Sequence, residues 1–488
     1  MNTPIRRLAV ACMVLFLALL LNASYVQYFQ ADELNDRSGN RRVLDAEFSR
    51  KRGPILVAGR QVAESVKSDD QFEYQRRYPQ PFKYAHSTGY YSYLYGFSAV
   101  ESTQNQILSG SDPRLFVDRF LDMLSNSQPD GGQVSLTLDP RAQTAAYDGV
   151  QQLGSGTEAA VVALEPSTGK ILAMVSNPTY DPNVLASHDV EAVERAWRRL
   201  IDAPGNPLFN RAIQETYPPG STFKLVTSAA ALESGDYDPD TMVPGGAELD
   251  LPQSSATLPN SGGGTCGGEQ ITLTQALQVS CNVAFGALGL DLGDDALRET
   301  SERFGFGTRY LEGIGGQAVS EFPDDIDQPQ TALSAIGQFD VRASPLQMAL
   351  VTATIANGGQ GMVPYLVDEV RAPDLSVLDK TSPEEMPDRA LGGSEANALT
   401  QMMVEVVDQG TGTTAQIPGI KVAGKTGTAQ SSPERPPYAW FVSFAPADDP
   451  QVAVAVLVED AGVERDLISG SGLAAPIAKA VMEAVIGQ

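Results

Sequence analysis

The stretch Tyr217-Pro-Pro-Gly-Ser-Thr-Phe-Lys224 decides how this chain folds around its reactive groups. Its prolines and glycine interrupt the preceding chain, and the following run, Leu225-Val-Thr-Ser-Ala-Ala-Ala-Leu232, is apolar almost all round, which is typical of a buried helix. We therefore expect Ser221 at the start of a helix and Lys224 one turn later on the same face. The free N–H groups and the positive end of that helix dipole suit a developing oxyanion. Taken alone, Ser221 would fit an ordinary N-cap equally well.

Two later motifs complete a set. Ser280-Cys281-Asn282 follows a predicted helix over 273–279, and Val422-Ala-Gly-Lys-Thr-Gly-Thr428 has the small residues of an edge strand. Read in order, S-x-x-K, S-x-N and K-T-G form the set of penicillin-binding proteins and serine β-lactamases. Each motif alone is weak, since the first would fit a helix cap, the second a pair of capping polar residues, and the third a glycine-bearing turn. The specificity lies in their combination.

The motifs assign chemical roles to four side chains. Ser221 is the candidate nucleophile, and a serine hydroxyl needs a base. The chain's two histidines lie near no nucleophile-like motif, so the candidate base is neutral Lys224, whose pKa burial would lower. The hydroxyl of Ser280 can pass a proton to a leaving amine, and the amide of Asn282 can hold a substrate backbone.

The K-T-G segment is expected to bind substrate. The charge of Lys425 would lower the pKa of the base further, and Lys425 also completes the catalytic set. With the hydroxyls of Thr426 and Thr428 it can bind a carboxylate. Gly427 is expected to leave room for the substrate backbone. The backbone N–H groups of Ser221 and Thr428 would form the oxyanion hole.

The composition excludes several classes of function. The chain has 60 acidic and 34 basic residues, a net charge of −26, and such a surface repels nucleic-acid phosphates. Two histidines and three cysteines are too few for a zinc site of several ligands, so no metal and no cofactor is expected. A length of 488 residues indicates two or three domains.

The N-terminal segment is predicted to direct the chain across a membrane. Arg6-Arg7 precedes an unbroken apolar run over 8–21, so the segment before the run should stay cytoplasmic. The run is short enough for a signal peptide, and Leu21-Asn22-Ala23 would be a weak cleavage site. Counted through Val26, it can also just span a bilayer. Either way, the remainder of the chain is expected to be exported.

Export bears on the cysteines. Cys12 lies in the apolar run, so Cys266 and Cys281 are the only cysteines outside it. An oxidising compartment favours a disulfide between them, which would fasten the glycine-rich loop 261–268 beside the S-x-N motif. Two free, buried thiols are the alternative.

The pattern of apolar residues predicts an α+β fold. Two hairpins, over 159–176 and 439–458, lie at opposite ends of the second part of the chain, with helical runs between them. The expected helices cover 116–124, 140–153, 221–232, 272–290, 344–357, 394–407 and 473–486, and further strands cover 53–57, 71–77 and 133–138. We predict a cytoplasmic tail over 1–7, a transmembrane anchor over 8–27, a non-catalytic domain over 28–150 and a catalytic domain over 151–488.

At these residues the chain resembles the class B penicillin-binding proteins. The resemblance extends to Arg52-Gly-Pro-Ile55, Pro207-Leu-Phe-Asn-Arg-Ala212, Gly337-Gln-Phe-Asp340, Ser344-Pro-Leu-Gln-Met-Ala349 and Ile355-Ala-Asn-Gly-Gly359. Ser280-Cys-Asn282 and Tyr84-Ala-His-Ser-Thr-Gly-Tyr90 are similar to the actinobacterial penicillin-binding protein A group. The resemblance implies a penicilloyl-serine transferase (β-lactamase-like) domain with a central antiparallel sheet flanked by helices. A smaller α+β domain of pedestal or dimerisation type and a retained, single transmembrane helix would precede it.

The resemblance also implies an activity. In this family a serine attacks the bond between the two terminal D-alanines of a peptidoglycan stem peptide, and an amine of a neighbouring stem then resolves the acyl-enzyme. β-Lactams acylate the same serine, here Ser221. The expected location is the cell membrane, with the catalytic domain extracytoplasmic, and the expected partners are a membrane glycan polymerase and proteins of elongation or division.

Four other functions are weighed against this one. A D,D-carboxypeptidase uses water as acceptor and shares all three motifs, so only product analysis separates it. A β-lactamase fits a chain of this length poorly, and the region before the transpeptidase is too short for a glycosyltransferase. A non-catalytic β-lactam receptor or division scaffold is disfavoured by the complete set of motif residues.

Overall fold

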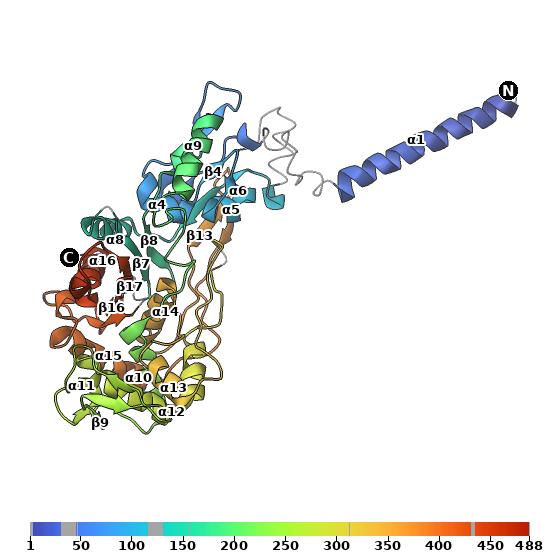
Figure 1. Ribbon diagram of the computed structural model, residues 1–488. Coiled ribbons are helices and arrows are strands. Elements are labelled where there is room, and N and C mark those ends of the chain that lie inside the picture. Colours follow the sequence, from blue (N-terminus) through green and yellow to red (C-terminus); the bar gives the residue numbers. More distant parts are fainter. Residues whose placement is uncertain are drawn as a thin grey trace.

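The computed structural model describes residues 3–30, 45, 47–115, 130–154, 156–311, 313–430 and 435–487. Within these residues the chain builds two large sheets with helices around them, and Figure 1 shows the two sheets in different parts of the molecule. The predicted helix over 116–124 lies outside the described residues.

The sheet that carries the K-T-G motif is five-stranded and antiparallel. Its order is β15-β16-β17-β7-β8, with bounds Ala423–Ala429, Tyr438–Ala445, Val452–Asp460, Glu158–Leu164 and Ile171–Asn177. The strands are apolar without alternation because helices cover both faces. α8 (Pro140–Gln152) and α16 (Ala475–Ile486) pack on one face, while α14 (Pro345–Ala356) packs on the other. The two predicted hairpins therefore meet in one sheet, with β17 beside β7 and β15 left at an edge.

A helical unit completes this part of the molecule. It contains α10 (Lys224–Ser234), α11 (Leu273–Gln278), α12 (Asn282–Arg303), α13 (Gln328–Ser334) and α15 (Gly393–Asp408), and two small sheets, β9 (Met242–Pro244) with β12 (Gln270–Thr272) and β10 (Glu248–Asp250) with β11 (Thr257–Pro259). The prediction of one helix over 272–290 is wrong at 279–281. The chain breaks there because Ser280 has a left-handed backbone, with φ of 61°.

The second large sheet has the order β14-β13-β6-β1-β2-β3. Its strands are Val377–Lys380, Val367–Arg371, Gln133–Leu136, Ile55–Val57, Arg60–Lys67 and Tyr74–Arg77. The remaining elements around it are α4 (Pro81–Thr88), β4 (Tyr91–Ser92), β5 (Gly96–Phe97), α5 (Ala99–Thr103), α6 (Asn105–Leu108) and α9 (Val190–Ile201).

This sheet draws on distant parts of the sequence. β13 and β14 come from the second half of the chain, and β13 pairs with β6. α8, most of which precedes residue 150, packs instead against the five-stranded sheet and α16. A domain division at residue 150 stays a prediction. In space, β13 and β14 from the second part of the sequence join the sheet of the first part, and α8 from the first part packs on the sheet of the second.

Arg52, which opens the resemblance to the family, lies in a buried ion cluster. Its guanidinium donates to the Glu101 carboxylate at 2.6 Å and lies 4.3 Å from the centre of the Tyr91 ring. Arg76 donates to the same carboxylate at 2.6 Å. Because two arginines neutralise it, Glu101 keeps a pKa below its usual value although burial alone would raise it. The cluster ties β1, β3 and α5 together.

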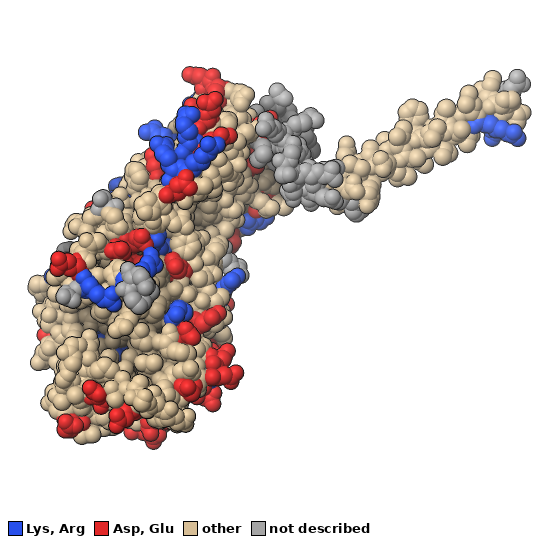
Figure 2. All heavy atoms as spheres, viewed as in Figure 1, with Lys and Arg blue, Asp and Glu red and all other residues tan. Residues whose placement is uncertain are grey.

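The first helix, α1, covers Thr3–Phe29 and is long and apolar enough to cross a membrane over Thr3–Tyr28. Charged side chains are unevenly spread over the rest of the surface. Figure 2 shows acidic side chains along the end of the molecule formed by α12 and β9, and basic and acidic side chains together over α9 at the opposite end.

Candidate active site

The nucleophile candidate lies on a tight turn. Gly220–Thr222 forms one turn of 3₁₀-helix that leads into α10. Residues three apart eclipse each other in a 3₁₀ turn, so Ser221 and Lys224 lie on the same side. Two contacts hold the turn from outside. Gly220 N–H donates to Gly337 O at 2.9 Å, and Trp440 Nε1 donates to Pro218 O at 3.0 Å.

Lys224 is fully buried at the first residue of α10. Its Nζ donates to Ser280 O and to Asn282 Oδ1, both at 2.8 Å, and lies 3.4 Å from Ser280 Oγ. The structure thus brings the S-x-x-K lysine onto both polar residues of the S-x-N motif. The left-handed backbone of Ser280 turns its carbonyl and its hydroxyl toward the same amine.

Lys425 approaches Ser280 from the sheet. Its Nζ, also fully buried, donates to Ser280 Oγ at 2.8 Å and to Thr426 O at 3.0 Å. Ser280 therefore stands between two lysines whose side chains come from α10 and β15. These hydrogen bonds join four of the five predicted catalytic residues, namely Lys224, Ser280, Asn282 and Lys425.

Both lysines are shifted toward their neutral forms. Burial lowers the pKa of Lys425 to about 7. The pKa of Lys224 lies well below its usual value, first because of burial and second because of the positive charge of Lys425. A buried amine with a lowered pKa is what a lysine general base requires.

Strand β15 carries the K-T-G motif at the edge of the sheet, as an edge strand that receives a peptide requires. The prediction that Gly427 leaves room for substrate stays a prediction, and the structure gives this glycine a second role. A Cβ on Gly427 would meet Thr222 Cγ2 at 2.9 Å and Pro219 O at 3.2 Å, so the glycine lets β15 approach the serine turn. The backbone of Thr428 also lies against this turn, since its carbonyl would be 3.1 Å from a Cβ on Gly220.

The two threonine hydroxyls differ. Thr426 is buried, and its Oγ1 shares a 2.6 Å hydrogen bond with Thr411 Oγ1, so a contact with substrate would have to use the remaining capacity of this hydroxyl. Thr428 is exposed at the sheet edge. Of the two, Thr428 is free to meet a substrate carboxylate. An oxyanion hole from the N–H groups of Ser221 and Thr428 stays a prediction.

A disulfide joins Cys266 to Cys281, with Cα atoms 5.8 Å apart. It attaches the glycine-rich loop 261–268 to the residue between Ser280 and Asn282. The loop also bonds through its backbone, since Cys266 N–H donates to Gly245 O at 2.8 Å. The S-x-N motif is therefore held by a covalent link as well as by Lys224.

Sequence reasoning missed two side chains near the motifs. Thr411 follows α15 and bonds both Thr426 Oγ1 and, through its N–H, Gln278 O at 3.3 Å. Its signal was the run Gly410-Thr-Gly-Thr-Thr414, which is unusually rich in small hydroxyl residues. Asn260 contacts the start of α12. It immediately precedes the predicted loop, and nothing in the sequence separates it from an ordinary turn residue.

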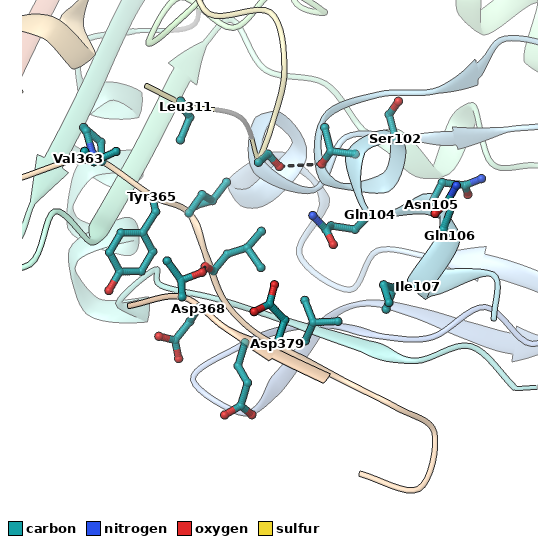
Figure 3. A pocket seen from close by; sticks show the side chains of 18 of the residues that line it. Ser102, Gln104, Asn105, Gln106, Ile107, Leu311, Val363, Tyr365, Asp368 and Asp379 are labelled. Atoms are coloured by element: carbon teal, nitrogen blue, oxygen red, sulfur yellow. Dashed lines mark hydrogen bonds between the residues drawn. The ribbon is translucent and has the colours of Figure 1, made fainter. Parts of the chain in front are cut away.

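A large cavity lies elsewhere. It has a volume of about 950 Å³ and lies between α5–α6 and the segment 363–370 with β13. Figure 3 shows Gln104 and Asn105 on one side of it and Tyr365, Asp368 and Asp379 on the other, and Thr103 Oγ1 donates to Gly313 O across it at 2.7 Å. No residue of the three motifs lines this cavity, so it is separate from the candidate active site. Within the described ranges, no group of three or more His, Cys, Asp or Glu side chains is placed to hold a metal ion.

A serine one turn from a buried lysine, a second serine between two lysines, and a K-T-G edge strand form the arrangement that penicillin-binding proteins share with serine β-lactamases. The family model of the penicillin binding protein transpeptidase domain matches residues 159–483. The model of the penicillin binding protein A dimerisation domain matches residues 52–134. The chain belongs to the penicillin-binding transpeptidase family, and the predicted class B resemblance is confirmed.

Within this family the chain is similar to the mycobacterial PbpA proteins. It is 47% identical to the peptidoglycan D,D-transpeptidase PbpA of Mycolicibacterium smegmatis over 100% of this chain and 99% of that protein. It is 46% identical to the Mycobacterium tuberculosis PbpA over the same shares. The ceftriaxone acyl-enzyme of M. tuberculosis penicillin-binding protein A superposes with a TM-score of 0.86 at 44% identity, covering 91% of this chain and 100% of that one. The fold class predicted from the sequence is confirmed.

Proposed function

We propose that this protein is a peptidoglycan D,D-transpeptidase that cross-links stem peptides through an acyl-enzyme on Ser221 and that β-lactams inhibit it by acylating the same residue. One observation carries the proposal. Two buried lysines from separate elements meet at the hydroxyl of Ser280, at 2.8 and 3.4 Å, and one of them lies one turn from Ser221. The names of the mycobacterial relatives support the same activity.

The hydrogen bonds of Lys224 explain how it can act as the base. A neutral amine has two N–H hydrogens and one lone pair. Ser280 O and Asn282 Oδ1 each accept at 2.8 Å, which uses both hydrogens. The lone pair is then left for the proton of Ser221, on the same side of the turn. As Lys224 takes that proton, Ser221 Oγ attacks the carbonyl carbon of the penultimate D-alanine.

The leaving group needs a proton next. Ser280 Oγ accepts from Lys425 at 2.8 Å, so its own O–H is available to the departing amine of the terminal D-alanine. Lys224, now protonated and 3.4 Å from Ser280 Oγ, can restore that proton. The N–H groups of Ser221 and Thr428 stabilise the oxyanion, and Thr428 and Lys425 meet the substrate carboxylate. The terminal D-alanine leaves, and Ser221 carries the acyl group.

In the second step the same groups transfer protons in the opposite direction. An amine from a neighbouring stem peptide attacks the acyl carbonyl and loses a proton to the Ser280–Lys224 pair. The bond to Ser221 Oγ breaks, its oxygen regains a proton, and the new amide bond is the cross-link. With water as acceptor the same groups would release a carboxylic acid, which is the D,D-carboxypeptidase reaction.

The proposal places this chemistry outside the cell. Helix α1 is apolar enough to anchor the chain in the cell membrane as a single span, and the arginines before its apolar core favour a cytoplasmic N-terminus. The partners proposed for the enzyme are a membrane glycan polymerase and proteins of elongation or division, as in other class B members. The domain matched over residues 52–134 is available for such contacts.

The test is a product assay. The protein without its first helix is incubated with a stem pentapeptide donor and a large excess of an amine acceptor, and the products are identified by mass. A dimeric cross-linked peptide that depends on Ser221 supports the proposal, with Ser221→Ala as control. Release of D-alanine with only tetrapeptide acid would identify a carboxypeptidase, and no reaction of either kind would overturn the assignment of an enzyme.

A further inference from the structure

Asn260 lies between the glycine-rich loop and the catalytic asparagine. It follows β11 and is half-buried. Its Oδ1 accepts from the backbone N–H of Asn282 at 3.0 Å and from that of Val283 at 3.1 Å. These are the first two residues of α12, whose N–H groups have no partner within the helix. Asn260 thus caps α12 from a distant part of the sequence.

The same short segment also holds the Asn282 side chain. Asn282 Nδ2 donates to Pro259 O at 3.1 Å, while its Oδ1 accepts from Lys224 Nζ at 2.8 Å. Asn282 is therefore held at its backbone by Asn260 and at its amide nitrogen by Pro259. With both fixed, its amide oxygen can face only the lysine.

The other end of Asn260 is bonded to loops. Its Nδ2 donates to Gly246 O at 2.8 Å and to Gly264 O at 2.9 Å. These two bonds fasten Asn260 to the glycine-rich loop and to the segment that follows β9. The amide of Asn260 thus has two separable functions, an oxygen that holds α12 and a nitrogen that holds loops.

We propose that Asn260 is a positioning residue for acyl transfer, because its amide oxygen fixes the start of α12 so that Asn282 takes one N–H of Lys224. This proposal rests on the proposed function of Lys224 as the base. If Asn282 moves from this position, one N–H of Lys224 loses its acceptor. The lone pair of Lys224 Nζ is then no longer restricted to the direction of Ser221. Ser280, two residues before Asn282, would shift with it.

The two functions can be separated by substitution. Asn260→Asp keeps an oxygen for the two N–H groups of α12 and loses both Nδ2 donors to the loops, and an aspartate suits a helix N-terminus. Asn260→Ala loses both the oxygen that accepts from α12 and the nitrogen that donates to the loops. Asn357→Ala is the matched control, since Asn357 Nδ2 also bonds a loop carbonyl, Gln360 O at 2.8 Å, in the turn after α14. The disulfide keeps the loop attached to α12 in every variant.

The measurement is acylation by a labelled penicillin across pH, resolved into a dissociation constant for the initial complex and a rate constant for acylation, with melting temperatures for each variant. For Asn260→Ala we expect the acylation rate constant at the alkaline plateau to fall by about 10- to 100-fold, the cost of a small misplacement of reacting groups. Asn260→Asp should stay within about threefold of wild type there, and its acidic limb should move to higher pH because the added negative charge favours protonated Lys224. Asn357→Ala should match wild type.

Several outcomes overturn the proposal. An Asn260→Ala rate constant within about twofold of wild type removes the positioning role. An Asp variant as slow as the Ala variant shows that the loop bonds matter and the oxygen does not. If Asn260→Ala does not fold, the Asn260→Asp variant decides alone. A fall of about tenfold in its acylation rate constant at the alkaline plateau would then contradict the proposal. Wild-type protein that is not labelled at Ser221 would instead contradict the proposed function itself.

Discussion

Replacing Lys425 by methionine tests the electrostatic coupling between the two lysines. Methionine keeps much of the length of the unbranched lysine side chain and removes its positive charge. Both Nζ atoms lie near Ser280 Oγ, at 2.8 and 3.4 Å, so they are at most about 6 Å apart. Lys224 must be neutral to act as base, and the charge of Lys425 opposes its protonation. Removing that charge raises the pKa of Lys224, so a higher pH is needed for acylation.

The structure sets the size of this effect. Two unit charges about 6 Å apart interact by roughly 3 kcal/mol at an effective dielectric constant of about 20, which corresponds to roughly 2 pKa units. The shift is smaller where Lys425 is only partly charged, because the pKa of Lys425 is itself lowered to about 7. The two groups titrate as a pair. We expect the acidic limb of the acylation profile to move up by about 1 to 2 pH units.

The assay is the rate of acylation by a labelled penicillin between about pH 5 and pH 10, a range that extends well to either side of the Lys425 pKa of about 7. Lys425→Arg is the matched control, because it keeps a positive charge at all these pH values and should leave the acidic limb at or below its wild-type position. A lower plateau rate is expected in both variants, since both alter the contact with Ser280. An acidic limb that stays in place in Lys425→Met would refute the coupling and leave Lys425 as a substrate anchor only.

Four further predictions follow from the same site and fold. Labelled penicillin should add one adduct mass, mapped to the peptide with Ser221, and label on another residue would contradict the mechanism. Lys224→Ala should slow acylation by about 10²- to 10⁴-fold, the usual loss for a general base, and a near wild-type rate would mean that another group is the base. Non-reducing peptide mapping of exported protein should recover Cys266 linked to Cys281. Two free thiols would contradict this prediction. Burial lowers the pKa of His86 from 6.5 to about 4, so the free energy of unfolding should fall by up to about 3 kcal/mol as the pH drops through this window, and His86→Gln should flatten that slope in urea titrations.

The parts of the site that depend on local spacing could be predicted from the sequence. Ser221 and Lys224 are three residues apart after a Pro-Pro-Gly break, so any helical turn places them together. The hairpins β7–β8 and β16–β17 have short connections and uniform apolar strands, so each was visible on its own. Spacing alone cannot predict that Ser280 and Lys425 meet, because they lie 145 residues apart. Their contact was expected only because the three motifs occur in the order of a known set.

The features that were missed depend on long-range packing. The sequence placed the S-x-N motif after a helix over 273–279 but also allowed one helical run over 272–290, because it does not reveal that Ser280 takes a left-handed backbone and bonds Lys224 Nζ through its carbonyl. Strands β13 and β14 join a sheet whose other four members lie more than 200 residues earlier, and the partner strand β6 offers no local signal for that choice. The packing role of Gly427 was also missed, because the sequence does not reveal that Thr222 lies against it.

The contact at Gly427 explains why the edge strand and the serine turn act as one site. On one side, Gly427 has no Cβ to push away Thr222, the residue after Ser221. On the other, Gly220 has φ of 53° and no Cβ to meet the backbone of β15, whose Ala429 Cβ would be 2.9 Å away. The N–H of Thr428 lies between these two contacts in the sequence, so its distance from the N–H of Ser221 is set by backbone packing. A pair of N–H groups fixed by packing needs no rearrangement when charge develops on a bound carbonyl, which is the condition for an effective oxyanion hole.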